Sequence, residues 1–172
     1  DPAALKAAES ILSNSFDWPS YFTIFPYKGN IREIGVNPGH PSHVVNIAMA
    51  VKYPGLKYTL AKDDKFRQAV FDGIRNLDEF HGQAGGRFAG DEHISGRRPT
   101  QGTELCGVVE YMFSLEVLLA QFGDVALADR LEMLGYNSNP GACTPDTWAH
   151  QYDQQANQVM CSVAKRRWAT ND

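Results

Sequence analysis

Residues 103–122 most constrain the fold, because they predict one long helix with an apolar face. Thr103 is a residue type typical of helix N-caps, and apolar side chains recur after it at helical spacing. These side chains are Leu105, Val108, Val109, Met112, Leu115 and Leu119. A stripe of this length has to be buried against other elements, so we expect a helical domain with a substantial core.

Four more segments have the same periodicity, and short capped turns join most of them. They are residues 2–14, 42–61, 63–81 and 124–134. Their predicted N-caps are Asp1, Ser42, Asp63 or Asp64, and Asp124. Pro54 and Gly55 are expected to kink or split the second segment. Since the sequence shows neither βαβ alternation nor a glycine-rich phosphate loop, we predict an all-α array of antiparallel helix pairs in a single domain over residues 1–172.

Residues 15–40 are predicted to form a long loop, because prolines and glycines interrupt any period there. Six aromatic side chains crowd into its first half: Phe16, Trp18, Tyr21, Phe22, Phe25 and Tyr27. Two interpretations are open. The rings either stack on sugar rings of a ligand or pack the loop onto the core, and the second interpretation is favoured.

Composition excludes some classes of function. The net charge of −4 argues against a nucleic-acid surface, and the absence of a run of about 18 consecutive apolar residues predicts no membrane span. The chain is compatible with a homodimer. Three cysteines, at positions 106, 143 and 161, are an odd number with no regular spacing, which favours a reducing compartment such as the cytoplasm.

Ionisable residues gather in the glycine-rich segment 82–102, which also has a predicted short strand at residues 87–89. Glu92 lies between Asp91 and His93, just before the long apolar helix. Adjacent like charges raise the pKa of one carboxyl group, which is what a general acid needs. The alternative is that this segment is only a turn followed by a cap.

Glu104 and Cys106 are candidate metal ligands in the first turn of the long helix. Two residues apart is about 200° of rotation on a regular helix, so they can share an ion only where the backbone is still entering the helix. The helix N-terminus is also expected to lower the pKa of the thiol. Zinc needs at least three protein ligands, and Glu110 is the nearest spare. Near the second helix, His40 and His43 flank Ser42 and could equally be structural.

Three stretches together resemble the glycoside hydrolase family 127, the β-L-arabinofuranosidase-like group. They read GHPSHVVNIAMAVKY, GRFAGDEHISGRRPTQGTELCGVVEYMFSLE and GDVALADRLEMLGYN, and the resemblance covers roughly residues 36 to 160. It implies an (α/α)6 barrel of helical hairpins, of which residues 1–172 would be an incomplete, central part of a longer protein. It also implies retaining hydrolysis of β-L-arabinofuranosides or related sugars.

The resemblance further implies roles for individual residues. In that family one glutamate and three cysteines hold zinc, and a zinc-bound cysteine is the proposed nucleophile. Glu104 and Cys106 match the family's Glu-x-Cys ligands, and Glu92 falls at its acid/base glutamate. His43 falls at a substrate-site histidine, and His93 is taken with it as substrate-binding. The family's nucleophile belongs to an adjacent Cys-Cys pair that this chain lacks, since Cys161 is followed by Ser162.

Overall fold

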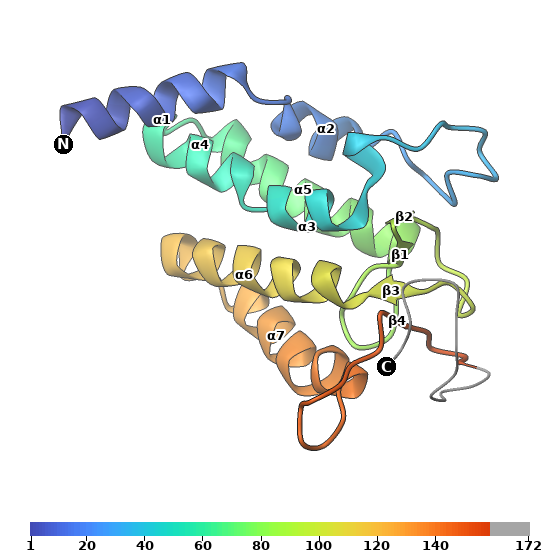
Figure 1. The fold of residues 1–172 in the computed structure, drawn as a ribbon. Coiled ribbons are helices and arrows are strands. Elements are labelled where there is room, and N and C mark those ends of the chain that lie inside the picture. Colours follow the sequence, from blue (N-terminus) through green and yellow to red (C-terminus); the bar gives the residue numbers. More distant parts are fainter. Residues whose placement is uncertain (159–172) are drawn as a thin grey trace.

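A computed structural model describes residues 1–158, and these are mostly helical, as predicted. Figure 1 shows the helices in chain order. They are α1 (Pro2–Asn14), α2 (Trp18–Ile24), α3 (Val44–Ala50), α4 (Tyr53–Ala61), α5 (Asp64–His81), α6 (Leu105–Phe122) and α7 (Val125–Met133). Short 3₁₀ turns at His40–Ser42 and Pro140–Ala142 and a π turn at Leu134–Ser138 complete the helical structure. Cys161 lies outside the described residues.

The predicted aspartate caps are confirmed at three helices. The side chains of Asp1, Asp63 and Asp124 each accept a hydrogen bond from a backbone N–H in the first turn of α1, α5 and α7. Pro54 occupies the first turn of α4, so it splits the predicted segment into two helices. Helix α3 differs from the prediction, because His43, not Ser42, is its N-cap.

The predicted loop at residues 15–40 contains a helix, α2, and this prediction is therefore wrong in part. Asp17 caps α2 by accepting hydrogen bonds from the backbone N–H and the hydroxyl of Ser20, at 3.4 and 2.6 Å. The aromatic residues recur at helical spacing, which the prolines obscured in the sequence. Trp18 is only 6% exposed, and Tyr21, Phe22 and Phe25 are also buried. The interpretation that the rings pack onto the core is confirmed for these four and for Tyr27, whereas Phe16 is 44% exposed.

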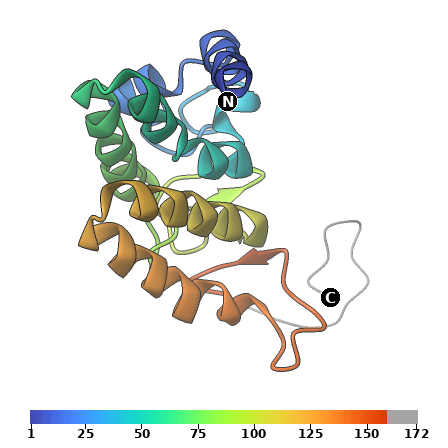
Figure 2. The ribbon, with the colours of Figure 1, turned by 90° about the vertical axis from the view of Figure 1, so that its left-hand side faces the viewer.

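Two glycines allow the core helices to pack closely against each other. A Cβ added to Gly73 of α5 would lie 2.6 Å from the Phe22 ring, so α2 packs directly on α5 there. A Cβ on Gly107 of α6 would lie 3.1 Å from Val44, at the start of α3. Helix α7 lies along the other side of α6, and in Figures 1 and 2 these two helices lie below the layer formed by α3, α4 and α5.

By length and composition alone, α6 is long and apolar enough to cross a membrane, the one such helix among residues 1–158. Its Val108, Leu115 and Leu118 are nevertheless buried against neighbouring elements. It also carries two glutamates, Glu110 and Glu116. We interpret α6 as the central core helix that the apolar spacing predicts.

A small four-stranded sheet stands at one end of the helices (Figure 1). Its strands are β1 (Gly90–Asp91), β2 (His93–Ile94), β3 (Thr103–Glu104) and β4 (Asp153–Gln154), in the order β2-β1-β3-β4. The strand predicted at residues 87–89 is therefore displaced toward the C-terminus. Thr103 is not an N-cap, because its backbone pairs with Gly90 and Gln154, and α6 begins only at Leu105.

Candidate functional site

The sheet brings together four segments that are far apart in the sequence. His43 pairs with His93, and Asp91 pairs with His93 across the β1–β2 turn. On the other side of β1, β3 pairs with β4, which sets Glu104 opposite Asp153. The N-terminal ends of α3 and α6 therefore meet the β1–β2 turn and β4 at one corner of the molecule (Figure 1). We call this place the polar corner, and its central residues are His43, Glu92, Glu104, Tyr152 and Asp153.

Glu92 occupies the tip of the β1–β2 turn in a left-handed backbone conformation, with φ of 60°. This conformation is uncommon for a residue with a side chain and is often found at functional sites. Its backbone oxygen accepts a hydrogen bond from the N–H of Val44, at 2.9 Å, which ties the turn to the start of α3. The side chain is half-buried, so one part of the carboxylate remains open to a ligand.

Two partners hold the Glu92 carboxylate. The hydroxyl of Tyr152 donates to Oε1, and Nε2 of His43 lies 3.4 Å from Oε2. Nδ1 of His43 accepts the N–H of Asn46, at 3.4 Å, as the N-cap of α3. With Nδ1 used as an acceptor, a neutral His43 carries its proton on Nε2 and directs it at Glu92.

Glu104 is the most buried acid in the polar corner, with 6% of its surface exposed. Its Oε2 atom is buried and has no hydrogen-bond partner among the described residues. Burial raises the pKa of Glu104, and the nearby charge of Glu92 raises it further. A buried carboxylate oxygen without a partner is costly, so this atom is a natural place for a cation or a proton.

Ligand atoms of His43, Glu92 and Glu104 all lie within 4.8 Å of one another, and this group could hold a metal ion. Cys106 is exposed and lies outside that group, but the Glu104 carboxylate is close enough to raise the pKa of its thiol. The two predicted ligands are thus adjacent, as expected where the backbone is still entering a helix. Glu104 and Cys106 supply oxygen and sulfur donors that suit zinc, and nothing in their geometry distinguishes zinc from other divalent ions.

The expected lowering of the Cys106 pKa is wrong. Burial of the thiol and the adjacent Glu104 carboxylate raise the pKa of Cys106, and these effects exceed the favourable field of the helix N-terminus. A bound cation would reverse this direction, because its positive charge next to the thiol outweighs the negative charge of the Glu104 carboxylate that holds it.

The other predicted residues divide between the polar corner and its surroundings. His93 faces His43 with the two rings perpendicular and 5.7 Å apart, and its Nδ1 lies 2.9 Å from the hydroxyl of Ser42. Burial and the neighbouring His43 lower the pKa of His93. His40 is outside the corner, against Trp18. Cys143 is also elsewhere, with its thiol on the carbonyl of Asn139.

Two residues of the corner were missed by sequence reasoning. Tyr152 contacts Glu92, and Asp153 lies near Asp91 and Glu104. Burial, followed by the charge and hydrogen bond of Asp91, raises the pKa of Asp153 to about 8. Both residues belong to the polar run 150–158. Only the pairing of β3 with β4 places them, and no motif signals it.

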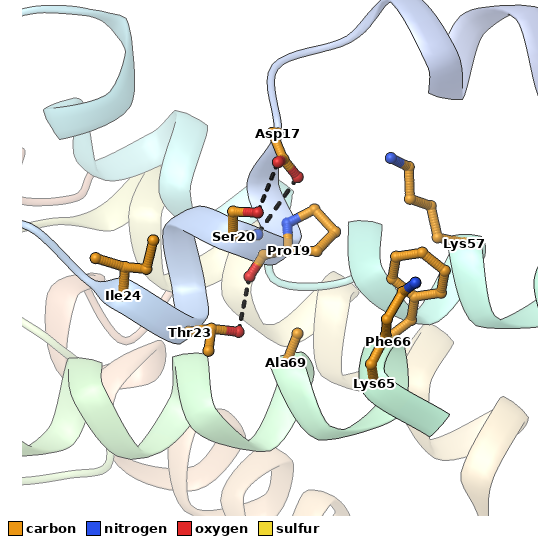
Figure 3. A pocket seen from close by; sticks show the side chains of 9 residues that line it. All are labelled: Asp17, Pro19, Ser20, Thr23, Ile24, Lys57, Lys65, Phe66 and Ala69. Carbon is orange, nitrogen blue, oxygen red and sulfur yellow. Dashed lines mark hydrogen bonds between the residues drawn. The ribbon is translucent and has the colours of Figure 1, made fainter. Parts of the chain in front are cut away.

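A larger pocket lies elsewhere, between α2, α4 and the start of α5 (Figure 3), with a volume of about 490 Å³. Its hydroxyl groups are already used, since Ser20 donates to Asp17 and Thr23 donates to the carbonyl of Pro19. The amines of Lys57 and Lys65 both lie over the ring of Phe66, which lines the pocket. The pocket contains none of the predicted site residues, and we do not assign the chemistry to it.

No family model matches this chain, and no curated protein with significant similarity is found. The polar corner is therefore interpreted from its own geometry.

Proposed function

We propose that this chain carries part of the active site of a retaining glycoside hydrolase that acts on β-L-arabinofuranosides or related sugars. The observation that supports this best is the arrangement around Glu92. A half-exposed carboxylate is held by a tyrosine and a histidine, and a second, buried carboxylate lies within 4.8 Å. Retaining hydrolysis requires one group that first protonates the leaving oxygen and later activates a water molecule, and the half-exposed Glu92 carboxylate suits that role.

Glu92 is proposed as the general acid and base. Its Oε1 atom accepts a hydrogen bond from the hydroxyl of Tyr152. We therefore place the proton that is transferred to the substrate on Oε2. In the first half-reaction this proton passes to the leaving-group oxygen of the glycoside. In the second, the carboxylate takes a proton from the attacking water. His43, whose Nε2 is 3.4 Å from Oε2, keeps that oxygen oriented, and it is proposed to face the sugar together with His93.

Glu104 and Cys106 are proposed to hold a zinc ion. A cation fits the buried, unpartnered Oε2 of Glu104 and the adjacent thiol. Bound zinc would keep the Cys106 thiol deprotonated at neutral pH. The ligand set is incomplete within residues 1–158, and the nucleophile is not assigned. The helical hairpins α4–α5 and α6–α7 support the further proposal that the domain is part of an (α/α) barrel.

Substitution of Glu92 tests its role. We expect Glu92→Gln to lower kcat/KM for an aryl β-L-arabinofuranoside by about 10²- to 10⁴-fold, because the leaving oxygen loses its proton donor. The loss should be much smaller for a 2,4-dinitrophenyl glycoside, whose leaving group needs little protonation. Glu79→Gln, an exposed change on α5, is the matched control. Equal losses on both substrates would remove Glu92 from the acid role.

Metal content separates the two possible uses of Glu92. If Glu104 and Cys106 hold the ion, Glu92→Gln keeps the bound metal of the parent, measured by plasma mass spectrometry after dialysis. If His43, Glu92 and Glu104 hold it instead, Glu92→Gln loses the metal, and Glu92 cannot be the general acid. Cys106→Ala should lose the metal if Glu104 and Cys106 hold it, and should keep the metal if His43, Glu92 and Glu104 hold it.

A non-catalytic carbohydrate-binding or structural module was the alternative. It relied on the aromatic side chains from Trp18 to Tyr27, and Trp18, Tyr21, Phe22, Phe25 and Tyr27 are buried in the core. No observation in the described residues favours this alternative over the hydrolase. If the unsubstituted protein binds sugar but hydrolyses none, the non-catalytic alternative would be favoured.

A further inference from the structure

A small polar cavity lies beside the β1–β2 turn, and of its lining residues only His93 has a proposed role above. Its volume is about 30 Å³, and it is lined chiefly by Asn30, Arg32, Asp91, His93, Ser95 and Gln101. A cavity volume of about 10–15 Å³ is enough for one water molecule, so this cavity can take a hydroxyl or hydroxymethyl group but no sugar ring. Asp91 and His93, which flank Glu92 in the chain, both line the cavity, whereas Glu92 itself does not.

The strongest sign of a ligand is Ser95. The residue is 7% exposed, and its hydroxyl is buried with no hydrogen-bond partner among residues 1–158. A buried hydroxyl left without a partner is unfavourable, so such groups are normally satisfied by water or by a ligand. Ser95 is thus an unsatisfied polar group in the wall of the cavity.

The wall that carries Ser95 is fixed from behind. The backbone N–H of Ser95 donates to the carbonyl of Ala89, at 3.3 Å. The N–H of Gly96 donates to Nδ1 of the buried His81, whose Nε2 donates to the carbonyl of Tyr27, at 2.9 and 2.7 Å. Gly96 itself has φ of 86°, which only glycine adopts readily. The cavity is therefore preorganised and not created by a ligand.

The lining chemistry selects a neutral hydroxyl group. Arg32 and the amides of Asn30 and Gln101 offer donors, whereas Asp91 offers a carboxylate acceptor. A hydroxyl group can accept from the first set and donate to Asp91. A carboxylate ligand would face the like charge of Asp91, and a methyl group would leave Ser95 unsatisfied.

We propose that this cavity is a specificity subsite that receives the exocyclic hydroxymethyl group of the glycoside. The proposal rests on the proposed hydrolase function. It predicts that the parent protein hydrolyses 4-nitrophenyl β-L-arabinofuranoside about 10- to 100-fold faster, in kcat/KM, than the 5-deoxy analogue, because the analogue lacks one hydrogen-bonding group.

Ser95→Ala is the decisive variant. We expect the ratio of kcat/KM between the two substrates to fall to within about threefold of unity, mainly through slower hydrolysis of the hydroxylated sugar. Ser13→Ala is the matched control, because it removes an exposed hydroxyl of α1 that donates to the carbonyl of Glu9. It should leave the ratio unchanged. If Ser95→Ala does not fold, as judged by its thermal transition, Gln101→Met is read in the same way.

Each outcome decides between the two ideas. A ratio near unity in the parent, or a high ratio that persists in both cavity variants, overturns the subsite and leaves the cavity as a site for water only. Hydrolysis of neither sugar by the parent overturns the proposed function, and the subsite falls with it. A high parental ratio that collapses in the cavity variants, and not in Ser13→Ala, establishes the subsite.

Discussion

Two regions of this molecule differ in the kind of group that they bury. In the aromatic layer, where α2 packs on α5, Phe22 fits against Gly73, and Asn76 donates to the Phe22 carbonyl at 2.8 Å. In the polar corner, Glu104 buries a carboxylate oxygen that has no partner among the described residues. Left-handed backbone occurs in both regions, at Phe25 with φ of 43° and at Glu92 with φ of 60°, and the aromatic layer also buries the hydroxyl of Tyr21 without a partner within residues 1–158. The first region gains stability from the burial of aromatic rings. The second buries an ionisable group that an ion or a proton would stabilise.

This contrast is what an active site predicts. Local strain and unsatisfied polar groups persist where function requires them, and the surrounding structure offsets their cost. If the contrast is real, substitutions in the aromatic layer should destabilise the fold, and neutral substitutions in the polar corner should stabilise it. The predictions below test that difference, beginning with the largest effect.

Phe22→Ala should produce the largest loss of stability. Phe22 is fully buried, and its removal leaves a cavity over Gly73 that the helices cannot fill. We expect the free energy of unfolding to fall by about 3–5 kcal/mol, measured by denaturant unfolding. Ile24→Ala is the matched control on the same helix, since Ile24 is 73% exposed, and it should change stability by less than about 0.5 kcal/mol. Similar effects of the two changes would show that α2 does not pack on α5.

His81 should make stability depend on pH. It is buried, and its Nδ1 accepts the N–H of Gly96, so protonation of that nitrogen would break the contact. Burial lowers the pKa of His81 from 6.5 to about 4. The unfolded state therefore binds more protons between these values. Stability is complete above pH 6.5, falls as the pH drops toward 4, and levels off below it, with a total loss on the order of 3 kcal/mol.

His81→Gln isolates this contribution from the other histidines. The variant should be less stable than the parent at pH 7, because its side chain cannot replace both ring nitrogens. Its unfolding free energy should also vary less between pH 6.5 and pH 4. If the unfolding free energies of the two proteins, measured with urea, fall equally between pH 6.5 and pH 4, the pH dependence belongs to residues of the polar corner instead.

Much of the fold follows from the sequence because its signals are local. The aspartate caps and the apolar spacing of α5 and α6 are determined by neighbours within a few residues. Helix α2 was missed because prolines mask its short period, and the start of α6 was misplaced because Thr103 pairs with Gly90 and Gln154. Such pairing is a tertiary effect that residue preference does not contain.

The candidate site was predictable to a similar extent. Glu92, His43, Glu104 and Cys106 were singled out from residue type and motif, and the structure brings them together. Tyr152 and Asp153 were not, because a two-residue strand carries no periodic signal. Their position depends on a contact between segments about 50 residues apart, which only the folded chain shows.

In the polar corner, Glu104→Gln should increase stability at neutral pH. Burial raises the pKa of Glu104, so the folded state is penalised once the pH exceeds the ordinary value for the carboxyl group. A neutral amide of the same shape removes that penalty, and we expect a gain of about 1 kcal/mol in chelator-treated protein. The gain should shrink at pH 4, where Glu104 is protonated in the parent. Destabilisation at both pH values would mean that the carboxylate is a structural partner.

The smallest effect should come from the backbone of Glu92, and it is isolated by comparing Glu92→Gly with Glu92→Ala. Both changes remove the carboxylate and its contacts with Tyr152 and His43, so they differ only in the cost of the left-handed conformation, with φ of 60°. Alanine bears that cost in the folded state, whereas glycine avoids it but loses more entropy on folding. These two terms oppose each other, and the cost of the left-handed conformation is the larger one. Glu92→Gly should therefore be the more stable variant by about 0.5–1 kcal/mol in urea unfolding. A more stable Glu92→Ala would show that the turn relaxes once the carboxylate is gone, and that the contacts of Glu92, not the strand pairing, impose its conformation.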